Sequence, residues 1–164
     1  MGTIEERCGG AVRGSGTAAR GSSSKHERMF IDVAKITARQ SNCVRLQVGA
    51  VAVKDDRIVA HGYNGTPSGF INCCEKFNKD DFDKKKHRMW SASFEIHAEM
   101  NVIAFAAKHG ISLKESVIYC THKPCNNCTK HLIQVGVKKV KYINDYPNDE
   151  ELFKDHIILE KIFC

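Results

Sequence analysis

The first regular pattern of hydrophobic and polar residues in the chain is helical. Ser24 followed by Glu27 fits a capping box, and apolar residues then recur at helical spacing from Met29 to Ile36. These features predict a helix over about 25–41. Two β-rich runs follow, at 48–53 and 58–63, and four charged residues separate them, which predicts a β-hairpin.

The second half of the chain alternates between helical and extended patterns. An alanine-rich helix is predicted over 96–109, stopped at Gly110, and a second helix over 126–135, ended by Gly136. Short strands are expected at 117–121 and 139–143, and a further helix over 150–156. This alternation indicates an α/β protein with three α/β/α layers around a central mixed sheet of about five strands.

Two segments lack a clear period. Residues 64–94 form a long polar stretch with Gly65, Pro67 and Gly69, and we expect an irregular segment that serves function or is held by a metal. Residues 1–24 are rich in glycine and poor in side chains that could pack. They are interpreted as a flexible tail, or as a segment added for expression, ahead of one domain at 25–164.

Composition narrows the function classes. A hydrophobic fraction of 42% and a charged fraction of 27% are ordinary for a soluble domain. No apolar run approaches the roughly 20 residues of a membrane helix, and no secretion signal is apparent, so we expect a cytoplasmic protein without a membrane partner. The net charge of +6 forms no basic stripe, which argues against a polynucleotide partner and suits either an anionic small molecule or a solubilising surface.

Eight cysteines in a chain without a secretion signal favour metal binding over disulfides. Cys125 and Cys128 lie three apart at a predicted helix start, where the helix dipole favours thiolates. His97 is the best candidate for a third ligand. One imidazole and two thiolates leave a zinc ion one open position, which is the pattern of a catalytic rather than a structural zinc.

Glu99 lies two residues after His97, near the start of the same predicted helix. A carboxylate there reaches a metal-bound water without binding the metal, and it suits general acid–base work. The Cys-x-x-Cys pair taken alone also fits a redox motif or half of a structural zinc site, and His-x-Glu alone is uninformative. Together and in this order they match the zinc deaminase signature.

With these motifs the chain, from about residue 25 to its end, resembles the zinc-dependent cytidine and deoxycytidylate deaminase superfamily. Three further segments resemble its deoxycytidylate (dCMP) deaminase branch: the loop GYNGTP at 62–67, the segment from Trp90-Ser91 to EIHAE at 95–99 with Asn101, and the aromatic stretch 142–146. The resemblance implies a cytidine-deaminase-like fold. It also implies hydrolysis of dCMP to dUMP and ammonia, supplying dUMP for thymidylate synthesis.

The resemblance also implies residue roles. Zinc is held by His97, Cys125 and Cys128, and Glu99 moves protons. The substrate is expected to contact Asn64, Glu95, Ala98 and Tyr146, with Glu95 accepting a hydrogen bond from the sugar hydroxyl and Tyr146 stacking on the base. For Asn64 the alternative is turn chemistry, and for Tyr146 it is ordinary packing. Lys108 is expected at the phosphate, with three rival candidates: Arg45, Arg88 and Lys123.

Regulation and assembly follow from the same resemblance. Such enzymes are commonly homohexamers that dCTP activates and dTTP inhibits. The effector site would include Tyr63 and Gly65, and Mg²⁺ would accompany the triphosphate. A second, structural zinc is expected on Cys43, Cys73 and His87, with buried reduced cysteines as the alternative. Cys8, Cys120 and Cys164 have no evident role.

Other functions were weighed against this one. A deaminase of dCTP, of both nucleotides or of a nucleoside differs only in its phosphate contact, which the sequence leaves open. A polynucleotide base deaminase would need a basic and aromatic strand-binding surface, and the chain has one tryptophan. A non-catalytic zinc module has no use for Glu99 beside the metal.

Overall fold

The fold is built on one five-stranded mixed sheet. The computed structural model describes residues 25–163, so the predicted tail 1–24, with the capping residue Ser24 and Cys8, and also Cys164, lie outside the described residues. The strands run in the order β2-β1-β3-β4-β5. β1 pairs antiparallel with β2 and β3, while β3, β4 and β5 run parallel. Their bounds are β1 (Gly49–Lys54), β2 (Arg57–Tyr63), β3 (Val117–His122), β4 (Lys139–Asn144) and β5 (Ile158–Lys161).

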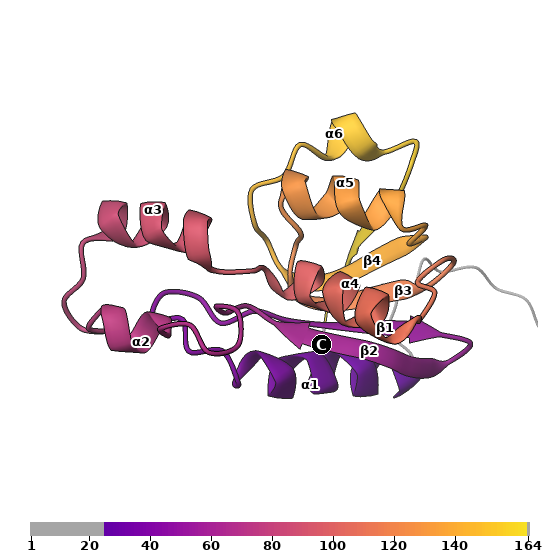
Figure 1. Cartoon of the computed structure of the whole chain (residues 1–164). Helices are drawn as coiled ribbons and strands as arrows, with labels where there is room; N and C mark the ends of the chain where they lie inside the picture. Colours follow the sequence, from indigo (N-terminus) through magenta and orange to yellow (C-terminus); the bar gives the residue numbers. More distant parts are fainter. Residues whose placement is uncertain (1–24, 164) are drawn as a thin grey trace, which may run out of the picture.

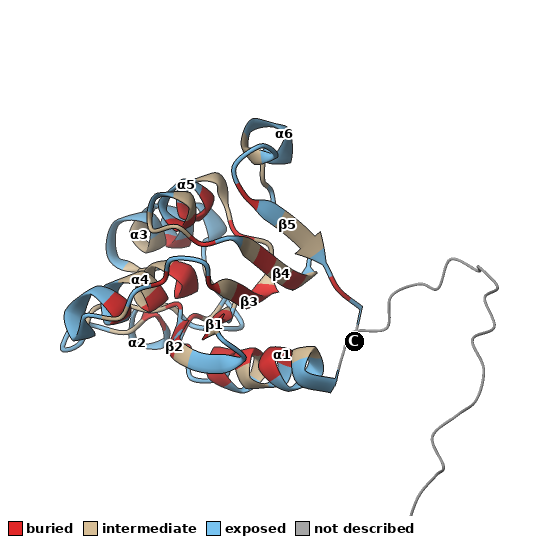
Figure 2. Ribbon diagram, turned by 90° about the vertical axis from the view of Figure 1, so that its right-hand side faces the viewer, coloured by how far each residue is buried: buried red, intermediate tan, exposed pale blue. Residues whose placement is uncertain are grey.

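Helices cover both faces of this sheet, which confirms the predicted three layers (Figure 1). α1 (Lys25–Ala38) packs on one face, and α4 (Ala98–His109) and α5 (Asn126–Gln134) lie on the other. Successive side chains of a strand point to opposite faces, so β1 serves both layers. Val51 belongs to the buried cluster under α1, and Ala52 to the cluster under α4 and α5. Figure 2 shows that the buried residues line the surfaces where helices meet the sheet.

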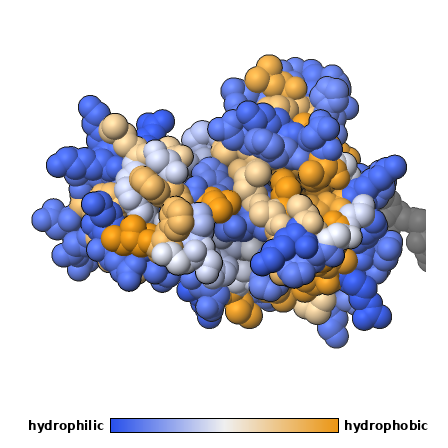
Figure 3. Space-filling view, viewed as in Figure 1, coloured by the Kyte–Doolittle hydropathy of each residue, from blue (hydrophilic) through white to orange (hydrophobic). Residues whose placement is uncertain are grey.

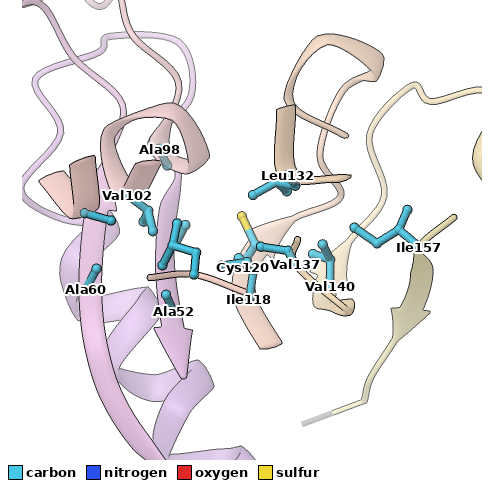
Figure 4. Packing of buried hydrophobic residues seen from close by; sticks show 13 residues of the cluster. Ala52, Ala60, Ala98, Val102, Ile118, Cys120, Leu132, Val137, Val140 and Ile157 are labelled. Carbon is cyan, nitrogen blue, oxygen red and sulfur yellow. The ribbon is translucent and has the colours of Figure 1, made fainter. Parts of the chain in front are cut away.

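Small residues let α4 approach the sheet closely. Ala52, Ala60 and Ala98 meet in the core beside Val102, and the larger Ile118, Leu132 and Val140 fill the space toward α5 (Figure 4). A Cβ on Gly62 would lie 2.7 Å from the carbonyl oxygen of Ala98, so β2 can touch the start of α4 only with glycine at this position. This contact sets where the first turn of α4 lies.

The stretch 64–94 differs from the irregular segment expected from its polar sequence. It contains α2 (Cys73–Lys76) and α3 (Lys84–Phe94), which project beyond the end of the sheet (Figure 1). Asp83 caps α3, because its Oδ1 accepts hydrogen bonds from the backbone N–H groups of Lys85 and Lys86 at 2.8 and 3.0 Å. His87 is the buried residue of α3, so the helix has almost no apolar stripe from which a hydrophobic period could be read.

Smaller differences concern element ends. Ile96 pairs with Gly65 in an isolated β-bridge, so α4 begins at Ala98 rather than at 96. The last predicted helix shortens to α6 (Glu150–Phe153), and β5 follows it. Within 25–163, the structure contains no helix that combines the length and apolar character needed to span a membrane.

Candidate active site

Two helices of the same layer begin side by side, and their first residues form a metal-ligating group. His97 is the N-cap of α4, Cys125 is the N-cap of α5, and Cys128 lies in the first turn of α5. The Nδ1 atom of His97 lies 3.6 Å from the Sγ of Cys125 and 3.3 Å from the Sγ of Cys128. Ligand atoms bound tetrahedrally to one zinc ion are separated by roughly 3.3–3.8 Å. The three donors therefore already have the spacing of a zinc site.

The charges of this group fit the same ligand. A hydrogen bond from Cys128, aided by one from His97, lowers the pKa of Cys125 to about 4. The same hydrogen bond between the two cysteines, together with burial, raises the pKa of Cys128. The hydrogen bond with Cys125 raises the pKa of His97. These hydrogen bonds favour the thiolate form of Cys125, which is the form in which a cysteine binds zinc.

Glu99 is enclosed beside these ligands. Its side chain is only 4% exposed, and burial raises the pKa of its carboxyl, although its own backbone N–H and His97 oppose that shift. A buried carboxyl whose pKa is raised is suited to general acid–base chemistry, because burial favours its protonated form.

A pocket opens in front of this group and collects most of the predicted substrate residues from distant parts of the chain. It is lined by Asn64, Glu95, His97, Ala98, Glu99, Cys125 and Tyr146. Tyr146 is 36% exposed at its rim.

Asn64 is already engaged with protein backbone in this pocket. Its Oδ1 accepts a hydrogen bond from the N–H of Val48 at 2.8 Å, and its Nδ2 donates to the carbonyl of Leu46 at 2.9 Å. The side chain of Asn64 thus connects the chain after β2 to the segment 46–48. This is a longer-range role than the local turn that was the alternative to substrate contact.

Of the four candidate phosphate ligands, two line the pocket and two do not. Arg45 and Lys123 line the pocket. Lys108 lies in the last turn of α4, about 15 Å along the helix axis from its start, and the structure does not bring it to the pocket of its own chain. Arg88, on α3, does not line the pocket either. The expectation that favoured Lys108 thus has no support from its position.

The residues expected to bind an effector, Tyr63 and Gly65, flank Asn64 in the chain but do not themselves line the pocket. Tyr63 ends β2 and is 39% exposed, and its carbonyl accepts a hydrogen bond from Asn101 Nδ2 at 2.6 Å. Gly65 exchanges backbone hydrogen bonds with Ile96, next to His97. The loop that follows β2 is therefore joined directly to the segment that leads into the zinc ligands.

A second group of possible metal ligands contributes three of its four residues to the lining of the same pocket. Ligand atoms of Cys43, Cys73, His87 and Glu95 all lie within 4.8 Å of one another. The first three were expected together from the sequence, but the fourth was assigned only to substrate. Ser91, whose hydroxyl donates to Glu95, was named in the sequence only as part of a family segment and was given no role, although it lies one helical turn before Glu95. Cys120 is fully buried in the core.

Comparison with known proteins agrees with this geometry. Residues 23–144 match the family model described as the cytidine and deoxycytidylate deaminase zinc-binding region. Deoxycytidylate deaminase of enterobacteria phage T4 is 31% identical over 156 residues, covering 76% of this chain and 81% of its own. ComE operon protein 2 of Bacillus subtilis is 38% identical over 130 residues, covering 76% of this chain and 64% of its own.

Solved structures give the same assignment. The dCMP deaminase of cyanophage S-TIM5, crystallised with dCMP and dUMP, superposes with a TM-score of 0.71 at 36% identity, covering 87% of this chain and all of its own. With the zinc-ligand geometry, the buried glutamate and these matches, the chain belongs to the cytidine and deoxycytidylate deaminase family.

Proposed function

We propose that this protein converts dCMP to dUMP and ammonia by hydrolysis. The observation that carries the proposal is the buried Glu99 beside the His97, Cys125 and Cys128 donors, at the base of a pocket. Relatives named deoxycytidylate deaminase, and a similar structure that holds dCMP and dUMP, support this choice of substrate.

Zinc held by His97, Cys125 and Cys128 would supply a Lewis acid that makes hydroxide available at neutral pH. Glu99 takes the proton of the attacking water and delivers it to N3 of the cytosine ring. It then helps protonate the departing amino group, so one carboxyl moves protons in both halves of the reaction. Its raised pKa keeps the protonated form accessible between these transfers.

The pocket walls would hold the rest of the nucleoside. Ala98 is the first residue of α4, so its N–H has no partner within the helix and can bind the base. Tyr146 would stack on the pyrimidine, Glu95 would accept a hydrogen bond from the sugar hydroxyl, and Asn64 would contact the nucleoside from the opposite wall.

For the phosphate we propose Arg45 in place of Lys108. Lys123 also lines the pocket, but its ammonium is ion-paired with Glu150 and lies 5.8 Å from the ring centroid of Tyr142. Arg45 is exposed at the pocket and takes part in no ion pair found within residues 25–163. Its guanidinium can bind a phosphate with two parallel hydrogen bonds.

The proposal is tested by ammonia release with dCMP, dCTP, deoxycytidine and cytidine in parallel, using Glu99→Gln as the matched inactive variant. Glutamine keeps the size of the side chain but cannot accept the proton, so we expect kcat for dCMP to fall about 10²–10⁴-fold with unchanged zinc content. Preferred turnover of dCTP would move the assignment to the triphosphate. A zinc-loaded protein that deaminates none of the four would reject a free nucleotide or nucleoside as substrate.

Regulation and assembly belong to the same proposal. An effector site for dCTP, with Mg²⁺, and for dTTP would include Tyr63 and Gly65, whose loop is hydrogen-bonded to the segment before His97.

Exposed hydrophobic residues, which a subunit interface would cover, support assembly into a homohexamer. They are Phe105 on α4, and Phe70, Ile71 and Met89 around α2 and α3. Figure 3 shows hydrophobic side chains over the middle of the molecule and over this projecting part. Light scattering would measure the assembly, and rates at subsaturating dCMP with each triphosphate would measure regulation. We also propose that the protein is located in the cytoplasm.

We also propose that Cys43, Cys73 and His87 hold a second, structural zinc. All three side chains are at most 7% exposed. Burial lowers the pKa of His87, which favours the neutral imidazole that binds a metal.

A further inference from the structure

The loop 145–149, which carries Tyr146, is attached to the turn that carries the cysteine ligands. Asn126 is the first residue of α5 and directly follows Cys125. Its Nδ2 donates a hydrogen bond to Oδ2 of Asp149 at 2.9 Å, and its Oδ1 accepts one from the backbone N–H of Asp149 at 2.8 Å. These reciprocal hydrogen bonds use both ends of one amide group, so they need an asparagine in one orientation.

A second asparagine attaches the same loop to the buried side of this turn. The Nδ2 of Asn148 donates to the carbonyl of Pro124 at 2.7 Å and to Oγ1 of Thr129 at 2.9 Å. Thr129 is fully buried, and its hydroxyl donates to the carbonyl of Cys125 at 3.0 Å. The end of the loop is therefore hydrogen-bonded to the segment that contains both cysteine ligands.

Tyr146 has no comparable attachment of its own. It lines the pocket, but among residues 25–163 its side chain takes part in no hydrogen bond and no ring contact. At the start of the loop, Asn144 Nδ2 donates to the carbonyl of Thr121 at 2.8 Å, and the N–H of Lys123 donates to the carbonyl of Asn144 at 2.9 Å. The two ends of the loop thus set where the Tyr146 ring lies.

We propose that Asn126, through its reciprocal hydrogen bonds with Asp149, is a positioning residue that holds Tyr146 at the pocket. The benefit to substrate binding rests on the proposed dCMP activity, whereas the attachment of the loop does not. Because Asn126 is adjacent to Cys125, the turn that binds zinc and the aromatic residue that stacks on the base keep a fixed relation to each other.

Asn126→Asp breaks this pair with little change in size. The new carboxylate can still accept from the N–H of Asp149, but it has no N–H to donate and faces the carboxylate of Asp149. Asn127→Asp is the matched control, because Asn127 is exposed on the same turn and its side chain takes part in no hydrogen bond within the described part of the chain. Both variants add the same charge close to the cysteines.

We expect kcat/KM for dCMP to fall about 3–10-fold in Asn126→Asp and to stay unchanged in Asn127→Asp, with equal zinc content. Adding Asp149→Asn to Asn126→Asp should restore kcat/KM, since the donor and the acceptor are then exchanged. In a Tyr146→Ala background, Asn126→Asp should have no further effect, because it acts through Tyr146.

No fall in kcat/KM, an equal fall with and without Tyr146, or a fall that accompanies loss of zinc would overturn the proposal. Asp149→Ala breaks the same pair from the exposed loop, and it supplies the comparison if Asn126→Asp does not fold.

Hydrogen exchange tests the attachment without any measurement of activity. The amides of 145–149 should exchange about 3–10-fold faster in Asn126→Asp than in Asn127→Asp, while those of β3 and β4 stay unchanged. Equal exchange in the two variants would refute the attachment. A wild type that does not deaminate dCMP, together with faster exchange in Asn126→Asp, would reject the proposed substrate and support the attachment.

Discussion

At the scale of single residues, the pocket is lined by the buried carboxyl of Glu99 and by the exposed Arg45, which takes part in no ion pair within residues 25–163. We expect Arg45→Gln to raise KM for dCMP by about 10–100-fold, since a charge-assisted hydrogen bond contributes about 1.5–3 kcal/mol. Deoxycytidine, which has no phosphate, should react at an unchanged rate. Parallel kinetics with the two substrates measure this, and Lys108→Gln is the matched control. A larger effect of Lys108→Gln would place the phosphate elsewhere.

Asn64 is the residue whose structural and substrate roles most need separating. Its side chain satisfies the backbone of both Leu46 and Val48, so Asn64→Ala leaves two backbone groups unpaired. The free energy of unfolding should fall by about 2–6 kcal/mol, at roughly 1–3 kcal/mol for each group. Chemical denaturation measures this loss, with Asn42→Ala as the control, because Asn42 is an exposed residue on the same segment. A fully stable Asn64→Ala variant that no longer uses dCMP would mean that substrate contact is its main role.

At the scale of elements, the contact of α1 with the sheet depends on one glycine. A Cβ on Gly49 would lie 2.1 Å from the carbonyl oxygen of Ala34 and 2.6 Å from the backbone nitrogen of Ala38, both within α1. Because these atoms belong to backbone, the helix itself would have to move.

We therefore expect Gly49→Ala to lower the free energy of unfolding by about 1–3 kcal/mol or more, as overpacking does. Gly65→Ala is the control, since the nearest atom to its added Cβ would be 3.9 Å away. Denaturant midpoints measure both variants, and equal midpoints would show that α1 adjusts without cost.

The helix α3 was not predicted from the sequence, which indicated an irregular segment in its place. Its first turn contains three lysines and its buried residue is a histidine, so the apolar spacing that predicted α1 is absent. What holds α3 is a cap from Asp83 and contacts of His87 with residues distant in the chain. β5 was not identified as an element for a related reason, because it is a short edge strand without a fully buried residue.

At the scale of the whole molecule, the free energy of unfolding should depend on pH through two buried phenols, those of Tyr119 and Tyr142. Burial raises the pKa of Tyr119 to about 12, and also that of Tyr142 to about 12. In the unfolded chain a tyrosine ionises near pH 10. The folded state thus binds more protons than the unfolded state above pH 10, so stability is present below that pH and is lost between about pH 10 and 12.

Tyr119 packs against Phe30 of α1, with ring centroids 5.1 Å apart, so Tyr119→Phe keeps the packing and removes the ionising group. Thermal melting from pH 8 to 12 should show the difference in stability shifting in favour of Tyr119→Phe only above pH 10. A difference that stays constant with pH would mean that the phenol ionises equally in both states.

Local chemistry in the sequence was enough to predict the three candidate zinc ligands that the structure brings together, and the buried carboxyl beside them. His97 with Glu99, and Cys125 with Cys128, are each separated by two or three residues at a helix start, so local geometry alone fixes their relative positions. The alternation of helices and strands likewise determined the three layers, because burial of one face per element leaves few arrangements.

Only the tertiary structure decided which distant residues share the pocket. It left Lys108 outside the pocket lining, placed Arg45 in that lining, and made Glu95 a member of both the pocket lining and the second group of possible metal ligands. These relations join segments far apart in the chain, such as Cys43 and Glu95, which are 52 residues apart. No local period reports such contacts, because they arise only when packing against the sheet fixes where each segment ends.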